Sequence, residues 1–173
     1  MHMIFRTLLI FLKKPFLKRS SLKDVTEIQM RVLPTDLDLL WHVNNGVYLS
    51  LMDFGRWDMV FRNGIFDLTR KKGWYAVVAG ESIKFRKALK LFDKFSLQTQ
   101  TVGYDEKYFF IQQKFIFKGE VYAVGMVRVR FLSQKGGSVS TAELLKELHV
   151  DLGENRGGEL SSEWFALESK FFA

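Results

Sequence analysis

The sequence predicts one α+β domain in which an antiparallel sheet curves around a single buried helix. Three observations predict it. Residues 25–33 alternate between two kinds of side chain, as a half-buried strand does. Residues 45–63 follow a helical pattern with apolar side chains nearly all round, which is typical of a buried helix. Four strand patterns then follow one another between residues 74 and 132 without an intervening helix, which favours antiparallel pairing.

The expected long helix has recognisable ends. Pro34 ends the preceding strand, because proline cannot donate to a strand ladder. Asn44 or Asn45 is a suitable N-cap, and Asn63-Gly64 is a suitable stop. Spacings of three and four residues predict two ion pairs on the helix surface, Asp53 with Arg56 and Asp58 with Arg62.

The later strands are expected at residues 74–86, 95–101, 109–117 and 121–132, with turns at residues 103–105 and 118–120. Gly80 inside the first of these strands indicates a bulge or a close approach of another segment. A basic connection at residues 70–72 precedes the strands, and a short helix at 141–149 and a glycine-rich loop at 153–158 follow them. We therefore expect a domain at 23–150, between an N-terminal segment (1–22) and a C-terminal extension (151–173).

Composition excludes several kinds of chemistry. The 173 residues suffice for one domain with a substantial core. Without cysteine the chain has no disulfide, thiol nucleophile or thiolate metal site, and its three histidines are too widely spaced to predict a metal site. The net charge of +7 favours an anionic partner, but the basic segments lack the interleaved aromatic residues that nucleic-acid binding would predict.

The N-terminal segment, residues 1–22, combines an apolar run with basic residues that follow it. The run is roughly half of the ~20 apolar residues that a membrane span needs. A secretory signal would instead place its positive charge before the apolar run. Two interpretations stay open: an amphipathic helix on a membrane surface, or a helix that covers the domain or a partner subunit.

The stretch between the first strand and the long helix has the highest density of side chains that could take part in catalysis. It places Asp38, His42 and the backbone amide of Asn45 in one loop at a helix start. A carboxylate can activate water or attack a carbonyl, an imidazole can transfer protons, and the first N–H groups of a helix can receive an oxyanion. Such a set suits acyl transfer to water. The structural alternative is that the aspartates cap turns, that His42 is a core residue, and that the asparagines only cap the helix.

These residues resemble a known family. Asp36-x-Asp38 followed by His42-Val43-Asn44-Asn45 and Tyr48 is similar to the D-x-D-x-x-x-H-V-N-N-x-x-Y signature of hotdog-fold acyl thioesterases, a group that includes the 4-hydroxybenzoyl-CoA and plant acyl-ACP thioesterases. Residues 48–53 and 83–86 fit best the thioesterase superfamily member 6-like proteins. The resemblance covers residues 25–148 and implies a hotdog fold, a five-stranded antiparallel sheet wrapped around one long central helix, usually assembled as a homodimer or a dimer of dimers.

The resemblance also implies roles for individual residues. It makes Asp38 the catalytic carboxylate, the Asn45 N–H the oxyanion donor and His42 an assisting group. The expected substrate is an acyl-CoA or another acyl thioester, with coenzyme A as part of the substrate and no separate cofactor. Five further residues are assigned to substrate binding, the basic ones at the phosphates of coenzyme A: Asp36, Asn44, Tyr48, Lys84 and Arg86.

Two departures from the signature motivate an alternative function. Leu40 replaces the asparagine of the plant enzymes' D-x-N-x-H triplet, and Trp41 stands where many relatives carry glycine. A protein that binds acyl groups or lipid without catalysis is therefore the second hypothesis. A 3-hydroxyacyl dehydratase is not favoured, because its H-x-x-x-x-P-x-x-P-G segment is absent from a chain with two prolines. We expect a cytoplasmic location, with peripheral membrane association through residues 1–22 as the other possibility.

Overall fold

The computed structural model describes residues 2–152 and 157–171, and it has the expected antiparallel sheet. The strand order is β1-β3-β4-β5-β2, and a short β6 pairs with β5. The strands are β1 (Thr26–Arg31), β2 (Trp74–Phe85), β3 (Lys94–Tyr104), β4 (Phe109–Phe117), β5 (Glu120–Ser133) and β6 (Ser138–Val139). Among the described residues, β1 and β2 are therefore the two edges of the sheet.

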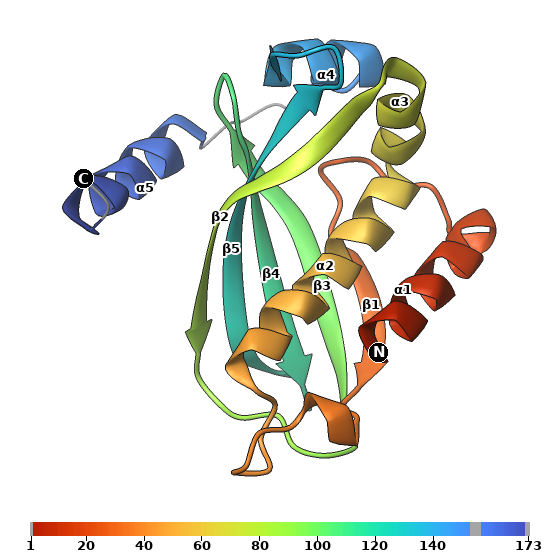
Figure 1. Ribbon diagram of the computed structural model, residues 1–173, viewed down its shortest axis with the longest axis vertical. Coiled ribbons are helices and arrows are strands. Elements are labelled where there is room, and N and C mark those ends of the chain that lie inside the picture. Colours follow the sequence, from red (N-terminus) through yellow and green to blue (C-terminus); the bar gives the residue numbers. More distant parts are fainter. Residues whose placement is uncertain (1, 153–156, 172–173) are drawn as a thin grey trace.

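The central helix α2 (Asn45–Arg62) lies in the concave face of this sheet (Figure 1). Its inward side chains, such as Leu51, Met52 and Phe54, are buried in the core. Gly55 lets the helix approach the sheet closely, because a Cβ there would lie 2.5 Å from the Thr99 hydroxyl. The sheet curved around one buried helix confirms the predicted α+β architecture.

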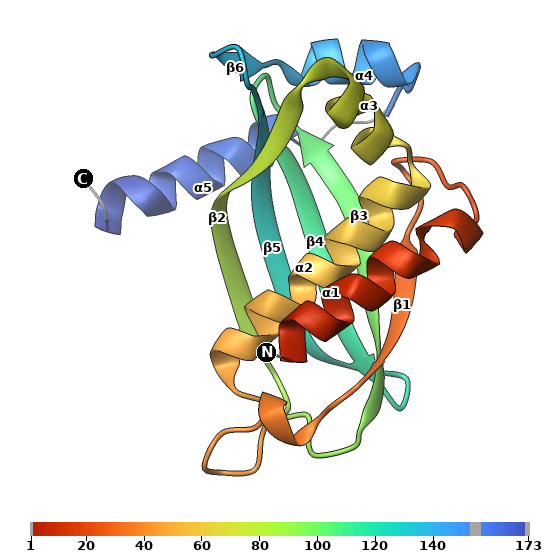
Figure 2. The same ribbon diagram turned by 45° about the vertical axis from the view of Figure 1, so that its right-hand side comes forward.

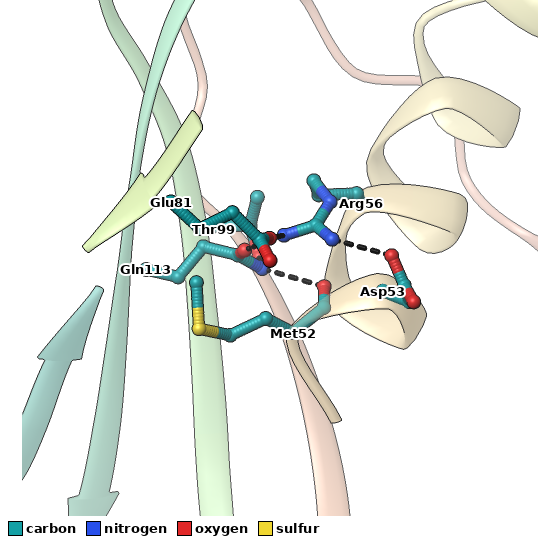
Figure 3. Close-up of polar contacts among 6 residues, drawn as sticks. All are labelled: Met52, Asp53, Arg56, Glu81, Thr99 and Gln113. Atoms are coloured by element: carbon teal, nitrogen blue, oxygen red, sulfur yellow. Dashed lines mark hydrogen bonds and ion pairs between the residues drawn. The ribbon is translucent and has the colours of Figure 1, made fainter. Parts of the chain in front are cut away.

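A buried polar network joins α2 to the strands beneath it (Figure 3). Gln113 of β4 is fully buried and donates to the Met52 carbonyl at 2.9 Å and the Thr99 hydroxyl at 3.0 Å. Its side-chain oxygen accepts from Arg56 at 2.9 Å. Arg56 also pairs with Asp53 and lies 2.8 Å from Glu81. The predicted Asp53–Arg56 pair is therefore confirmed, as is the Asp58–Arg62 pair at 2.6 Å.

Of the three register shifts in the described sheet, two fall at glycines, and the third lies between Phe115 and Ile116 of β4. The β2–β5 register shifts between Val78 and Gly80, and Trp164 of a later helix lies 2.9 Å from the Cβ position of Gly80. Both expectations for Gly80, a bulge and a close approach, are confirmed. The expected turn at residues 103–105 instead lies inside β3 up to Tyr104, because a register shift between Thr101 and Gly103 absorbs the glycine.

Two helices were not expected from the sequence. The basic connection is part of α3 (Ile65–Lys72), which lies between left-handed Gly64 and Gly73 and buries Ile65. The expected short helix is α4 (Thr141–Leu148). The C-terminal extension contains the second unexpected helix, α5 (Gly157–Phe171), while residues 153–156 of the expected glycine-rich loop lie outside the described residues. Arg128 places its guanidinium over three aromatic rings, those of Tyr108, Trp164 and Phe165. Since Arg128 alternates with core-facing Val127 and Val129, α5 covers the outer face of the sheet.

The N-terminal helix α1 (His2–Lys13) and the 3₁₀ turn η1 (Lys14–Phe16) lie beside α2 (Figure 2). Phe11 packs against the aromatic rings of Trp57, Phe61 and Phe66. Lys14 pairs with Asp67 of α3. The helix thus covers part of the domain, while its outer side chains stay exposed. In the described ranges, no helix combines the length and apolar character that crossing a membrane requires.

Candidate active site

The loop between β1 and α2 folds back on itself, starting with the 3₁₀ turn η2 (Pro34–Asp36). Leu37 and Val43 form an antiparallel bridge. On one side of it, the Asp38 N–H donates to the His42 carbonyl at 2.8 Å; on the other, the Asn44 N–H donates to the Asp36 carbonyl at 2.9 Å. The fold-back therefore places Asp38 beside His42 and Asp36 beside the start of α2.

The Asp38 carboxylate has one oxygen engaged in the loop. Its Oδ1 accepts the N–H groups of Leu40 at 2.8 Å and His42 at 3.2 Å, which forms a side-chain-capped turn. Within the described part of the chain, Oδ2 has no hydrogen-bond donor, and the side chain is half-buried. The carboxylate is therefore held in a fixed orientation while one oxygen stays available to a ligand.

The N-terminus of α2, at Asn45, follows directly after this loop in the chain. The Asn44 side chain accepts the Gly46 N–H at 2.9 Å, and its carbonyl accepts the Val47 N–H at 2.9 Å. Asn44 is therefore the N-cap. No acceptor among the described residues takes the Asn45 N–H. A first-turn N–H without an internal partner is the kind of donor that binds a developing oxyanion.

Asp36 lies beneath the loop rather than on its surface. Its side chain is fully buried, and Oδ2 accepts from Arg6 at 2.7 Å and from the Leu33 N–H at 2.8 Å. These contacts give Asp36 a position that supports the loop. Its assignment to substrate binding stays a prediction that would require the loop to open.

A second segment, residues 87–93 between β2 and β3, forms backbone contacts with the site loop. His42 forms a bridge with Lys90, and the Val43 N–H donates to the Leu89 carbonyl at 3.0 Å. The buried hydroxyl of Tyr48 accepts the Leu89 N–H at 3.3 Å. Burial raises the pKa of Tyr48 above its ordinary value. Tyr48 therefore holds the segment that carries Lys90, and its direct contact with substrate stays a prediction.

The remaining assigned residues are exposed at the end of β2 that leads into this segment. Lys84 and Arg86 both have exposed side chains. Lys87 pairs with Glu120, and this hydrogen bond raises the pKa of the Lys87 ammonium. The structure thus brings Lys90 directly to His42, while Lys84 and Arg86 lie farther along the same strand and its connection.

The tip of the site loop is apolar and exposed. Leu39, Leu40 and Trp41 are 98%, 73% and 70% exposed. Trp41 has a φ of 61°, a left-handed conformation that glycine adopts without strain. Three consecutive apolar side chains are therefore exposed beside the Asp38 turn.

An apolar pocket of about 370 Å³ lies between α2, α3 and the N-terminal half of β2. This pocket was not predicted from the sequence. Its walls include Trp57, Val60, Phe66 and Val78, and Asp53 and Arg56 lie among the lining residues. The volume is in the usual range for small-ligand sites. The only signal in the sequence was that α2 is apolar nearly all round, which a fully packed helix would also show.

A helix wrapped by an antiparallel sheet, with a carboxylate-bearing loop at its N-terminus, defines the hotdog class of protein. The chain belongs to the thioesterase-like superfamily, whose family model matches residues 32–152. It is 39% identical to Protein THEM6 of Xenopus laevis over 85 residues (49% of this chain, 41% of that protein) and 32% identical to Protein THEM6 of Danio rerio over 136 residues (77% and 67%). The chain thus matches about half the length of these relatives.

Solved structures show the same fold. The probable thioesterase YbaW from Escherichia coli superimposes with a TM-score of 0.67 and 22% identity, over 71% of this chain and 95% of that one. The gentisyl-coenzyme A thioesterase BH1999 gives a TM-score of 0.63 and 19% identity, over 70% and 99%. At these identities the likeness concerns the fold.

Proposed function

We propose that the protein is an acyl-CoA thioesterase with its reaction centre at Asp38 and the N-terminus of α2. The observation that carries the proposal is that one loop holds a carboxylate by two backbone N–H groups and leads into a helix whose first N–H has no acceptor among the described residues. The thioesterase-like superfamily membership supports the same reaction class.

The chemistry follows from this arrangement. The thioester carbonyl accepts the Asn45 N–H, and the partial positive charge of the helix start stabilises the oxyanion. Asp38 either removes a proton from the attacking water or attacks the carbonyl itself. When Asp38 acts as the base, the hydroxide adds to the carbonyl, the C–S bond breaks, the acid is released, and the coenzyme A thiolate takes up the proton. When Asp38 attacks, the C–S bond breaks to leave an acyl-Asp38 anhydride, and water then hydrolyses this anhydride to the free acid and the regenerated carboxylate, while the thiolate takes up the proton released by water. His42, paired with Asp38 through the backbone, is the group we assign to assist that proton transfer.

We propose that the site is completed by a second copy of the chain. β2 is twelve residues long and lies at a sheet edge, with exposed side chains such as Tyr75 and Val78 along it. Two-fold pairing along β2 would continue the sheet and set the two α2 helices antiparallel. The loop of one copy would then face the apolar pocket at the other end of its partner's helix. That pocket would hold the acyl group.

Basic residues near the loop suit the phosphates of coenzyme A. Lys84 and Arg86 are exposed at the end of β2, and Lys90 bridges to His42. Their charges add to the net charge of +7. An anionic carrier would approach this end of the molecule at a rate that falls with ionic strength.

A panel of acyl-CoA esters tests the proposal through release of the free thiol. Asp38→Asn should lower kcat/KM by at least about 10²-fold, the scale of a lost general base. The asparagine oxygen can still accept the Leu40 and His42 N–H groups, so the loop should stay folded. Asp105→Asn is the matched control, because Asp105 accepts two backbone N–H groups at 2.7 Å in a turn outside the proposed site. If the wild-type protein hydrolyses none of the esters, the proposed thioesterase activity is refuted.

A second function has its own observation. Oδ1 of Asp38 has a structural role in the turn. The side chains of Leu40 and Trp41 beside it are apolar and exposed, whereas the entrance of a hydrolytic site is expected to be polar and to admit water. We therefore retain a non-catalytic acyl- or lipid-binding protein as the alternative. Mass spectrometry of the purified protein would then detect a co-purified lipid, in the same amount for wild type and Asp38→Asn.

We also propose that α1 lies on a membrane surface. Its outward side chains Ile4, Leu8 and Leu12 are 72%, 54% and 61% exposed, and lysines follow at the C-terminal end of the helix. Apolar burial and attraction to anionic lipids together bind such helices. Leu8→Glu and Leu12→Glu should abolish flotation with phosphatidylserine-containing vesicles. Equal flotation of wild type and both variants would remove this part of the proposal.

A further inference from the structure

The site loop has an exposed apolar tip, formed by Leu39, Leu40 and Trp41. Backbone contacts fix the turn behind the tip, because the Trp41 N–H donates to the Asp38 carbonyl at 3.1 Å and the Asp38 N–H donates to the His42 carbonyl. The loop, orange in Figure 1, projects beyond the lower end of the sheet. The exposure of the tip therefore follows from the fold of the loop itself.

Phe92 is a fourth exposed apolar side chain at this end of the molecule. It lies in the segment 87–93, whose Lys90 forms a bridge with His42 of the site loop. Trp41 and Phe92 both have a left-handed φ, of 61° and 64°, which bulky residues rarely adopt. Glycine would fit both turns with less strain, so the backbone alone does not account for two aromatic side chains here.

Basic side chains lie around the two loops. Strands β2 and β4 end at this end of the sheet and β5 begins there, since Phe85 pairs with Ala123 and Phe117 with Glu120. Four cations at this end are exposed and form no ion pair within the described part of the chain: Lys84, Arg86, Lys90 and Lys118. These cations contribute to the net charge of +7.

The acidic residues of this end leave its charge positive. Ion pairs neutralise two carboxylates, those of Asp36 with Arg6 and of Glu120 with Lys87. Asp38 and Asp93 accept backbone N–H groups of their own turns and form no ion pair with a described residue. Because four unpaired cations outnumber these two carboxylates, the apolar tip lies within a positively charged end of the molecule.

We propose that this end of the molecule docks on an anionic membrane surface. Leu39, Leu40 and Trp41 would enter the boundary between headgroups and lipid chains, about 5–10 Å deep, and the four cations would contact anionic headgroups. Tryptophan suits this position, because its ring is apolar and its N–H is polar. A bilayer supplies both complements of the surface, apolar chains for the tip and negative charge around it.

The docking surface adjoins α1, for which we propose the same partner. Arg6 of this helix contacts Asp36 at the base of the site loop, and Ile4 and Phe5 beside Arg6 are exposed. A bilayer is an extended partner, so it can contact a helix and a loop that are neighbours on the surface.

The consequence for the substrate rests on the proposed thioesterase function. Asp38 and the start of α2 would lie at the bilayer surface, so the acyl ester would reach them from the membrane. A long-chain acyl-CoA in a bilayer has its chain among the lipids and its phosphates at the headgroups, where Lys84 and Arg86 would lie. The substrate class is therefore long-chain acyl-CoA that partitions into membranes, rather than short water-soluble esters.

Tryptophan fluorescence of the full-length chain tests the insertion. With vesicles of phosphatidylcholine and phosphatidylserine, the emission should shift to shorter wavelength, and lipids brominated in their chains should quench it, because Trp41 leaves water. The chain has four tryptophans, so Trp41→Phe is the reference. This variant should still bind the vesicles but should lose most of the shift and of the quenching.

Flotation with the same vesicles tests the apolar and the charged contacts separately. Leu39→Glu should weaken binding at least about tenfold, because a leucine is no longer transferred from water, whereas Leu167→Glu, at an exposed position of α5, should leave binding unchanged. Lys118→Glu should weaken binding about fivefold or more, and Lys135→Glu, in the turn that follows β5 at its opposite end, should not. Without phosphatidylserine, the two lysine variants should bind alike.

Two further variants separate this surface from the functions proposed above. Leu8→Glu with Leu12→Glu alters the outer face of α1, and Trp41 should still be quenched in this protein, although at lower affinity. Asp38→Asn should bind vesicles at least as well as wild type. Vesicle binding without hydrolysis of any ester would therefore refute the thioesterase and leave the docking intact. Hydrolysis of long-chain esters by a protein that does not bind vesicles would refute the docking alone.

Any of three results would overturn this docking. Wild-type flotation of both Leu39→Glu and Lys118→Glu would show that this end of the molecule does not contact the lipid. Flotation without quenching of Trp41 would place the contact at α1 alone. An assembly in sedimentation velocity that Leu39→Glu, but not Leu167→Glu, dissociates would show that a second copy covers the tip.

Discussion

The guanidinium of Arg6 on the N-terminal helix lies 2.7 Å from the carboxylate of Asp36, which is fully buried beneath the site loop. Asp36 in turn accepts the Leu33 N–H through its side chain and the Asn44 N–H through its carbonyl. The N-terminal helix α1, the site loop and the start of α2 therefore meet at one aspartate. The N-terminal helix is part of the support of the proposed site.

Removal of the Arg6 charge should destabilise the protein. Arg6→Met keeps most of the apolar stem but removes a guanidinium that pairs with a buried carboxylate, a change that typically costs about 3 kcal/mol or more. Urea unfolding followed by circular dichroism measures the change. Arg19→Met is the matched control, because Arg19 is 71% exposed and lies 3.9 Å from Asp67, so its loss should cost less than about 1 kcal/mol.

A double variant tells whether this cost comes from the loss of the Arg6–Asp36 ion pair. Arg6→Met combined with Asp36→Leu removes both partners and should regain part of the stability that Arg6→Met loses. If the two single changes simply add, the ion pair is not what couples α1 to the loop.

Gly55 should not tolerate alanine, although alanine is the better helix former by about 1 kcal/mol. A Cβ at this position would lie 2.5 Å from Thr99 Oγ1 and 2.7 Å from Gln113 Nε2, inside the polar network of Figure 3. We expect Gly55→Ala to cost about 1–3 kcal/mol of unfolding free energy, as overpacking does. Gly158→Ala, where a Cβ of α5 meets nothing within 4 Å, should instead be neutral or stabilising. A stable Gly55→Ala protein would contradict the close packing.

The fold could be predicted from the sequence because its pattern is carried by whole elements. The alternation along β1 and the apolar circumference of α2 persist over several turns or pleats, and Gly80 marked both a bulge and a contact. The ion pairs of α2 could be predicted because they join neighbours in one helix. That the loop carrying Asp38 leads into the N-terminus of α2 followed from chain order alone.

Contacts between distant segments could not be predicted in this way. Arg6 and Asp36 are thirty residues apart, and neither side chain indicates the other in the sequence. The same holds for Arg128 and the α5 rings that enclose it, since a cation and an aromatic residue have no fixed spacing. The apolar pocket could not be predicted for a related reason. A helical pattern shows which residues are buried from water but not whether the space around them is fully packed.

Trp41→Gly should stabilise the loop. A non-glycine residue with left-handed φ costs about 1 kcal/mol, and the exposed indole contributes little packing that its removal could cost. Thermal unfolding should therefore give an equal or higher Tm, whereas Leu40→Gly, at a neighbouring exposed position without positive φ, should lower it slightly. If Trp41→Gly lowers Tm more than Leu40→Gly does, the indole packs against something that stabilises the loop, for example a partner subunit.

The hydroxyl of Tyr48 gives a prediction that depends on pH. Tyr48→Phe leaves the Leu89 N–H without its acceptor and should cost about 1–2 kcal/mol near pH 8. Burial raises the pKa of Tyr48 in the folded state, so above about pH 10 the unfolded chain loses this proton more readily than the folded one. The wild-type protein therefore loses stability from this group as the pH rises, and the phenylalanine variant does not.

The difference between the two proteins should consequently shrink between about pH 8 and pH 11, as measured by urea unfolding across that range. Tyr75→Phe, at an exposed position of β2, is the control and should change the unfolding free energy only slightly at pH 8. A gap between wild type and Tyr48→Phe that stays constant or widens with pH would show that the hydroxyl ionises as easily in the folded protein as in the unfolded chain. The segment carrying Lys90 would then be held by something other than this buried hydrogen bond.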